Sequence, residues 1–257
     1  QGLSADAIYS ISVWAIIGGI LGARVVHIID FWGPIYQHDP IRLLYVWQGG
    51  IAIYGGILGG FAGGALYVII RNSHRFLAMW GSVYKVMPFL GEPNKAPLPP
   101  IGLMVDITTP ALLISMAIGR VGDIINGEHF AKATNLAWGF IYTNPSSPGY
   151  QQPASHPAVA YELIFDLLLL AAIWPLRKRL RPHGMYFVLY GGLYSMGRFF
   201  LSFLRVEQIP YFDVLNQAQI IALIVMAVAI PLVVFKAKFV KPTQDAESGR
   251  RGQRRAR

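Results

Sequence analysis

Two long apolar segments without a single charged residue constrain this fold most: Gly49 to Ile70 and Ala218 to Phe235. A helix needs about 20 apolar residues to cross the hydrocarbon core of a bilayer, and both segments approach or exceed that length. Only 14% of the chain is charged, so it has too few charges to cover a water-facing surface. The sequence therefore predicts a polytopic membrane protein.

Six segments have the length and composition of membrane spans. We place them at about 8–29, 49–70, 101–119, 158–176, 184–204 and 218–235. Spans of this kind are helices, because a helix pairs all its backbone polar groups internally. The predicted fold is an all-α polytopic membrane protein of about six transmembrane helices. Residues 1–235 form a single transmembrane domain, and 120–157 form a small external loop or arm.

The basic residues predict the orientation of these spans. Of the 22 Lys and Arg, 16 lie in three segments, 71–100, 177–181 and 236–257. These segments share one side of a six-span protein, which the positive-inside rule makes cytoplasmic. The net charge of +9 is then a topology signal, and it does not indicate nucleic-acid binding. We expect 71–100 to be a connection without its own core and 236–257 to be a disordered cytoplasmic tail.

A dense polar cluster follows the third span. The stretch GRVGDIINGEHF carries Arg120, Asp123, Asn126, Glu128 and His129. Polar groups this dense at a membrane boundary are costly unless they pair with each other or with a charged ligand. A helix end with ordinary flanking charges is the plainer interpretation. A second cluster at the start of the next span favours a site instead, and it contains His156, Tyr161 and Glu162.

Arginines in two other spans also need explaining. Arg198 lies inside an apolar span and Arg205 about two turns further on, at its outer end. A buried arginine needs an anionic partner. The candidates are Asp123, Glu128, Glu162 or a lipid phosphate. Arg24, near the outer end of the first span, either snorkels to the interface or binds a ligand.

The second span is rich in glycine. Eight of the residues from Gly49 to Ile70 are glycine, and six of them form two ladders, Gly55-Gly59-Gly63 and Gly56-Gly60-Gly64. Small residues at this spacing allow another helix backbone to approach closely. Tyr54 stands just before them, a phenol inside the membrane with space for a ligand beside it.

At these residues the chain resembles the prolipoprotein diacylglyceryl transferases, membrane enzymes that begin bacterial lipoprotein maturation. The resemblance runs from GILGARVVHIIDFW through VWQGGIAIYGGILGG, MAIGRVGDIINGEH, SHPAVAYE and YSMGRFFLSFLR to LNQAQ. The family signature is Gly-Arg-x-x-Asn-Phe-x-Asn-x-Glu. Arg120, Asn126 and Glu128 match it, whereas Asp123 and Ile124 replace the usual Asn and Phe.

The chain departs from the family pattern at three points. Tyr54-Gly55-Gly56 stands where many members have a His-Gly-Gly that is regarded as catalytic. Ser202 stands four residues after Arg198, where many members have a glutamate. The family usually has seven spans, so we expect this chain to start after the first of them.

The resemblance implies a reaction in the bacterial inner membrane. The diacylglyceryl group of phosphatidylglycerol would move to the lipobox cysteine of a prolipoprotein signal peptide, forming a thioether and releasing glycerol phosphate. Such a displacement needs cations for the phosphate and a base for the thiol. We expect Arg120 and Arg198 to bind the phosphate, because guanidinium binds it bidentately. The further lipid-binding candidates are Tyr54, Gly55, Gly56, Asp123, Asn126, Glu162 and Arg205.

The base is open among Glu128, His129, His156 and Tyr54. A phenol with an ordinary pKa near 10 is a poor base at neutral pH, so we expect Tyr54 to orient the lipid head group or relay a proton. The chain has no cysteine, in agreement with a thiol supplied by the substrate, and we predict neither a metal nor a cofactor. Two rival hypotheses remain. A non-catalytic lipid-binding membrane protein is favoured by Tyr54 and Ser202, and a transporter is disfavoured by the lack of repeats.

Overall fold

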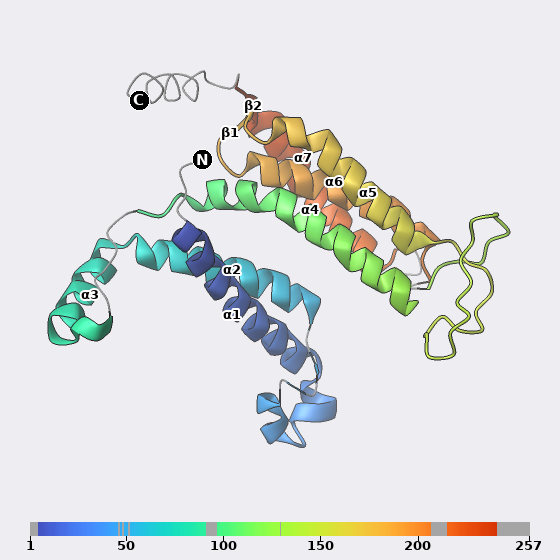
Figure 1. Ribbon diagram of the computed structural model, residues 1–257, viewed down its shortest axis with the longest axis horizontal. Coiled ribbons are helices and arrows are strands. Elements are labelled where there is room, and N and C mark those ends of the chain that lie inside the picture. Colours follow the sequence, from blue (N-terminus) through green and yellow to red (C-terminus); the bar gives the residue numbers. More distant parts are fainter. Residues whose placement is uncertain are drawn as a thin grey trace, which may run out of the picture. The chain divides into compact units, whose positions relative to one another are not determined.

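The computed structural model describes residues 5–45, 47, 49–50, 52–90, 97–128, 130–206 and 215–240, except the side chains of Ile53, Tyr54 and Leu90. The chain divides into two compact units, Gln1–Ile101 and Gly102–Arg257 (Figure 1). Each unit has its own helix packing, and the predicted single domain over 1–235 stays a prediction.

The first unit is built on a pair of helices, α1 (Ala5–Asp30) and α2 (Ile53–Arg71), whose backbones touch. A Cβ atom built on Gly59 would overlap the carbonyl oxygen of Gly18, and one on Gly55 would overlap that of Gly22. Only glycine fits at these positions. The structure therefore confirms that this glycine ladder packs against a helix, and it identifies that helix as α1.

Arg24 of α1 binds the connection between the two helices. Its side chain is buried, and its guanidinium donates to the carbonyl oxygens of Leu43, Gly49 and Gly50 at 3.3, 2.8 and 3.0 Å. It also lies over the ring of Tyr36. Arg24 therefore holds the connection, whose short helical turns are η1 (Trp32–Tyr36) and η2 (Pro40–Leu44).

A helix that we did not predict follows α2. The segment 71–100 contains α3 (His74–Val86) and the turn η4 (Pro88–Leu90). The described residues of α3 include no buried one, which agrees with a segment that lacks its own core. The apolar residues of α3 recur at helical spacing, but a half-polar helix of 13 residues lacks the hydropathy of a membrane span and was therefore missed.

The second unit is a bundle of four helices with two short strands. In Figure 1 the helices lie side by side, with the strands at one end and the long connection from α4 to α5 at the other. The strands β1 and β2 pair antiparallel. The elements are α4 (Ile101–Asn126), α5 (Ala158–Ile173), η5 (Trp174–Leu176), β1 (Leu180–Arg181), α6 (Met185–Leu201), η6 (Ser202–Leu204), α7 (Gln217–Lys236) and β2 (Lys238–Phe239).

The helices agree with the predicted fold class. Among the described residues, five helices are long and apolar enough to cross a membrane, and a sixth apolar helix, Gly55–Arg71, is shorter. Every predicted span overlaps one of them, with ends that differ by up to seven residues. The largest difference is α4, which continues through Asn126 and so carries the polar cluster on a helix. Lys238 and Phe239, expected in the tail, form β2, while 241–257 lie outside the described residues.

Two polar contacts fix the ends of helices in this bundle. The carboxylate of Asp106 in α4 accepts hydrogen bonds from the backbone nitrogens of Gly184 and Phe187 at 2.8 and 3.0 Å. An acid on one helix thus caps another, α6. The LNQAQ stretch forms a capping box at the start of α7, in which Asn216 and Gln219 bond each other's backbone nitrogens.

Candidate functional site

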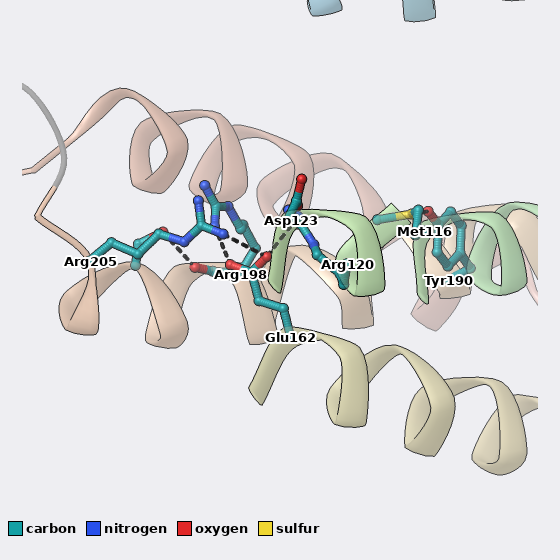
Figure 2. Close-up of polar contacts among 8 residues, drawn as sticks. Met116, Arg120, Asp123, Glu162, Tyr190, Arg198 and Arg205 are labelled. Carbon is teal, nitrogen blue, oxygen red and sulfur yellow. Dashed lines mark hydrogen bonds and ion pairs between the residues drawn. The ribbon is translucent and has the colours of Figure 1, made fainter. Parts of the chain in front are cut away.

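A single carboxylate, that of Glu162 in α5, forms ion pairs with three arginines (Figure 2). Its Oε2 atom lies 2.6 Å from Arg120 and 2.9 Å from Arg205, and its Oε1 atom accepts a short hydrogen bond from Arg198. The Glu162 side chain is only 5% exposed. Glu162, one of the four partners left open for Arg198, is therefore a partner in the structure.

The cluster carries a net positive charge. Arg120 also pairs with Asp123 at 2.9 Å, one turn further along α4. Three guanidinium groups and two carboxylates leave these five residues at +1, a count that does not include the nearby carboxyl group of Asp166. Within the five residues, the excess of guanidinium groups over carboxylates has the sign to attract an anion.

The three arginines differ in their access to an outside ligand. The side chains of Arg120 and Arg198 are 18% and 19% exposed, whereas that of Arg205 is 4% exposed. Arg120 and Arg198 can therefore reach a ligand at the surface of the bundle. Arg205 is buried and faces Glu162.

Local packing explains why these side chains meet. A Cβ atom on Gly197 would overlap the ring of Phe165, so glycine lets α5 and α6 approach right beside Arg198. Arg205 is held by the external segment, because Ala131 bridges to it and Lys132 donates to the carbonyl oxygen of Leu204. Ser202, at the position of the family's glutamate, donates to the Arg198 carbonyl oxygen at 2.7 Å.

A pocket lies beside this cluster, between the segment that follows α4 (residues 127–157, predicted to be external) and the first turn of α5. Glu128 and His156 both line it, together with Tyr142 and residues 158–160. Residues 158–160 precede Glu162 by two to four positions, roughly 3–6 Å along the helix axis. The pocket and the arginine cluster are therefore neighbours on α5.

The groups in the pocket differ in what they can do with a proton. The Nδ1 atom of His156 is buried, and no described residue forms a hydrogen bond with it. Glu128 is exposed, and Asn126 donates to it weakly at 3.5 Å. Burial raises the pKa of the Tyr142 phenol, which therefore stays neutral at ordinary pH. A proton acceptor in this pocket is thus His156 or Glu128.

The predicted site residues fall into three groups. Arg120, Asp123, Glu162, Arg198 and Arg205 come together in one cluster, and Asn126, Glu128 and His156 lie at or beside the pocket. Tyr54, Gly55 and Gly56 belong to the first unit, so their part in the site stays a prediction. The Tyr54 side chain and His129 lie outside the described residues.

Sequence reasoning missed two polar groups near the cluster. Asp166 is 1% exposed, and neither of its carboxyl oxygens has a hydrogen-bond partner among the described residues. It stands four residues after Glu162, on the same helix face, which is the signal that would have found it. The hydroxyl of Tyr190 donates to the Met116 sulfur at 3.3 Å. Within the described part of the chain, no group of His, Asp and Glu has the arrangement of a metal site.

Comparison with known proteins identifies the family. The model of the prolipoprotein diacylglyceryl transferases matches residues 1–92 and 94–235. The chain belongs to this family. A phosphatidylglycerol–prolipoprotein diacylglyceryl transferase of Dehalococcoides mccartyi is 33% identical over 242 residues, which are 94% of this chain and 81% of the relative. The enzyme of the same name from Staphylococcus haemolyticus is 29% identical over 255 residues, 96% of this chain and 79% of the relative.

The arginine cluster and the pocket both lie in parts of the chain that resemble this diacylglyceryl transferase family. The arginine cluster and the pocket occupy the regions that carry the family signature and the SHPAVAYE stretch. Both involve the first turns of α5, where the connection from α4 ends.

Proposed function

We propose that this chain transfers the diacylglyceryl group of phosphatidylglycerol to the thiol of prolipoproteins, at the lipobox cysteine. The sulfur attacks the glycerol carbon that carries the phosphate, forming the S–C bond as the C–O bond breaks. The electron pair of that bond leaves on glycerol phosphate. The thiol proton goes to a base. The cluster of three arginines on Glu162, in a member of this family, is the observation that supports this function most.

The charge change at the phosphate explains the need for arginine. The phosphodiester of phosphatidylglycerol carries one negative charge, and the leaving glycerol phosphate gains a second. Cations fixed beside it stabilise the transition state more than the ground state, which lowers the barrier. Arg120 and Arg198 have the exposure to contact the phosphate.

Glu162 and Arg205 act by positioning in this proposal. A carboxylate shared by three guanidinium groups holds them in place before the lipid arrives, so little reorganisation is needed during the reaction. Because Arg205 is buried against Glu162, we assign it to this framework and not to lipid contact.

We assign the base to His156, with Glu128 as the alternative. The unpaired buried Nδ1 atom of His156 is available to accept a proton in the pocket, and the reactive carbon would lie between it and the arginines. Asn126 then steadies Glu128, and Tyr54 orients the head group. A base in this role contributes about 10²–10⁴-fold to the rate.

The location proposed for this chemistry is the outer side of the bacterial inner membrane. The basic segments 71–100, 177–181 and 236–257 support a cytoplasmic C-terminus. The external segment and the pocket beneath it then face the compartment that exported precursors enter.

The test is transfer by the purified chain in vesicles that contain phosphatidylglycerol. A labelled lipobox peptide is added, and the product is examined for the mass of one diacylglyceryl group on its cysteine. We expect that gain with wild type and none when the peptide cysteine is replaced by serine. Vesicles made only of phosphatidylcholine should give no product.

Two variants test the base within the same assay. His156→Ala is expected to lower the rate about 100-fold or more, and Glu128→Gln by less. His38→Ala, which changes an exposed histidine in the first unit, is the control and should not change the rate. If Glu128→Gln lowers the rate more than His156→Ala does, the base is Glu128.

A further inference from the structure

The helix α3 separates its side chains into two faces. At 100° per residue, every Phe, Leu, Met, Trp, Val and Tyr of His74–Val86 falls on one half of the helix. The other positions occupy the remaining arc, and they are His74, Arg75, Ala78, Gly81, Ser82 and Lys85. This is the pattern of a helix that lies along a boundary between water and an apolar phase.

Two of the seven apolar residues on this face are exposed in the described structure, and the other five, Phe76, Leu77, Trp80, Val83 and Tyr84, are half-buried. Met79 and Val86 are 56% and 80% exposed, and no described residue of α3 is buried. The rings of Phe76 and Trp80 stack with their centroids 6.1 Å apart, which makes a continuous apolar surface. Exposed apolar area of this size needs a covering phase.

The chain connection and the charges indicate which phase covers it. Only Asn72 and Ser73 separate α3 from α2, an apolar helix of the membrane domain, so α3 starts close to the bilayer surface. From residue 71 to 91 the chain has basic residues and no Asp or Glu. Tryptophan and tyrosine, both present in α3, are enriched at membrane interfaces.

We propose that α3 is an interfacial helix, with its apolar face in the cytoplasmic leaflet and Arg75 and Lys85 on anionic phospholipid head groups. This surface is distinct from the arginine cluster on Glu162, and its existence does not depend on the transfer reaction. Phosphatidylglycerol has the required charge, as do other anionic phospholipids.

The absence of cysteine from the chain makes a direct test possible, because a single introduced cysteine can carry a nitroxide label. The full chain is placed in bilayers, and each label is tested for collision with oxygen, which concentrates in lipid, and with a water-soluble nickel chelate. The positions are Met79→Cys on the apolar face and Ala78→Cys on the polar face. Leu58→Cys, exposed on α2, and Ser146→Cys, exposed in the external segment, give the lipid and water references.

The expected result is a label at 79 that collides with oxygen nearly as the lipid reference does, and one at 78 that collides with the nickel chelate. Nickel access to both labels would place α3 in water and overturn the proposal. Shielding of both from both reagents would show that α3 packs against protein, which also overturns it.

The charge part is tested with the label at 79 in two bilayers. When phosphatidylglycerol replaces part of the phosphatidylcholine, the label should lie deeper in the bilayer. It should then collide more with oxygen and less with the nickel chelate. Arg75→Gln with Lys85→Gln should remove that response, since each basic residue near an anionic surface changes the binding constant roughly fivefold. A response that the double variant leaves intact would show that these two residues do not bind the head groups.

Discussion

Arg120 of α4 and Glu162 of α5 form an ion pair of 2.6 Å in which the side chains are 18% and 5% exposed. The same Glu162 oxygen lies 2.9 Å from Arg205, beyond the end of α6. One carboxylate therefore ties together the ends of three helices. Loss of this carboxylate should lower both the stability of the second unit and the rate of transfer.

Glu162→Gln is expected to destabilise the second unit by roughly 3–5 kcal/mol, because three guanidinium groups lose the charge between them. Thermal unfolding of the chain in vesicles or detergent measures this. Arg205→Gln removes one of the three positive charges. The double variant should then lose clearly less than the sum of the two single losses. Additive losses would mean that Glu162 and Arg205 do not act together.

Arg120→Lys and Arg198→Lys should each lower transfer strongly, about tenfold or more. Lysine keeps the positive charge but loses the planar fork that binds phosphate through two hydrogen bonds. The assay is the mass gain of the lipobox peptide. Arg179→Lys, at an exposed position between η5 and β1, is the matched control and should keep the wild-type rate. Wild-type turnover in both cluster variants would contradict bidentate phosphate binding.

Tyr54→Phe is expected to slow transfer by about two- to tenfold, because a residue that orients the head group loses one hydrogen bond of roughly 0.5–1.5 kcal/mol. The rate is measured together with phosphatidylglycerol binding. A loss of several orders of magnitude, with fold and lipid binding intact, would make Tyr54 the base in place of His156. Tyr54→His would then be expected to restore or raise the rate.

Two adjacent glycines of α2 give a sharp test of its contact with α1. A Cβ atom on Gly63 would overlap the Trp14 carbonyl oxygen, whereas one on Gly64 would meet only Ala15 and Ile11 at ordinary distances. Gly63→Ala should therefore destabilise the helix pair by roughly 1–3 kcal/mol. Gly64→Ala should be neutral or slightly stabilising, since alanine favours a helix by about 1 kcal/mol over glycine. Equal effects would refute direct backbone contact.

Orientation can be tested with reporters fused to the chain. A reporter after Arg181 should read as cytoplasmic and one inserted near Ser147 as external, because the basic segments define the inner side. The opposite pattern would place the arginine cluster on the cytoplasmic side and remove the proposed access of exported precursors.

Local patterns in the sequence predicted most of the helices and most of the site. Apolar length alone located the six spans, because the bilayer sets that length. The cost of polar groups in a membrane was enough to select Arg120, Arg198 and Glu162 as members of a site. Residue spacing also predicted that glycines of α2 would meet another helix.

The partners across helices could not be predicted in the same way. Arg198 had four candidate partners, and its partner Glu162 lies 36 residues away on α5, which packs against α6 where Phe165 meets Gly197. The extension of α4 through Asn126 was missed because its last turns are polar, like a loop. The helix α3 was missed because a half-polar helix of 13 residues lacks the hydropathy of a span.

The Asp106 cap of α6 has a consequence for the biogenesis of the protein. Gly184 follows Asp106 by 78 residues, which a ribosome adds in roughly 4–16 s at 5–20 residues per second. During that interval α4 has been made, but the two amide groups that satisfy its carboxylate have not. Until they arrive, the carboxyl group of Asp106 lacks both of these backbone partners, so we expect α4 to reach its final position only when α6 is in place. Synthesis stopped between the two helices would leave a membrane segment with an unsatisfied acid, a recognisable sign of an unfinished chain.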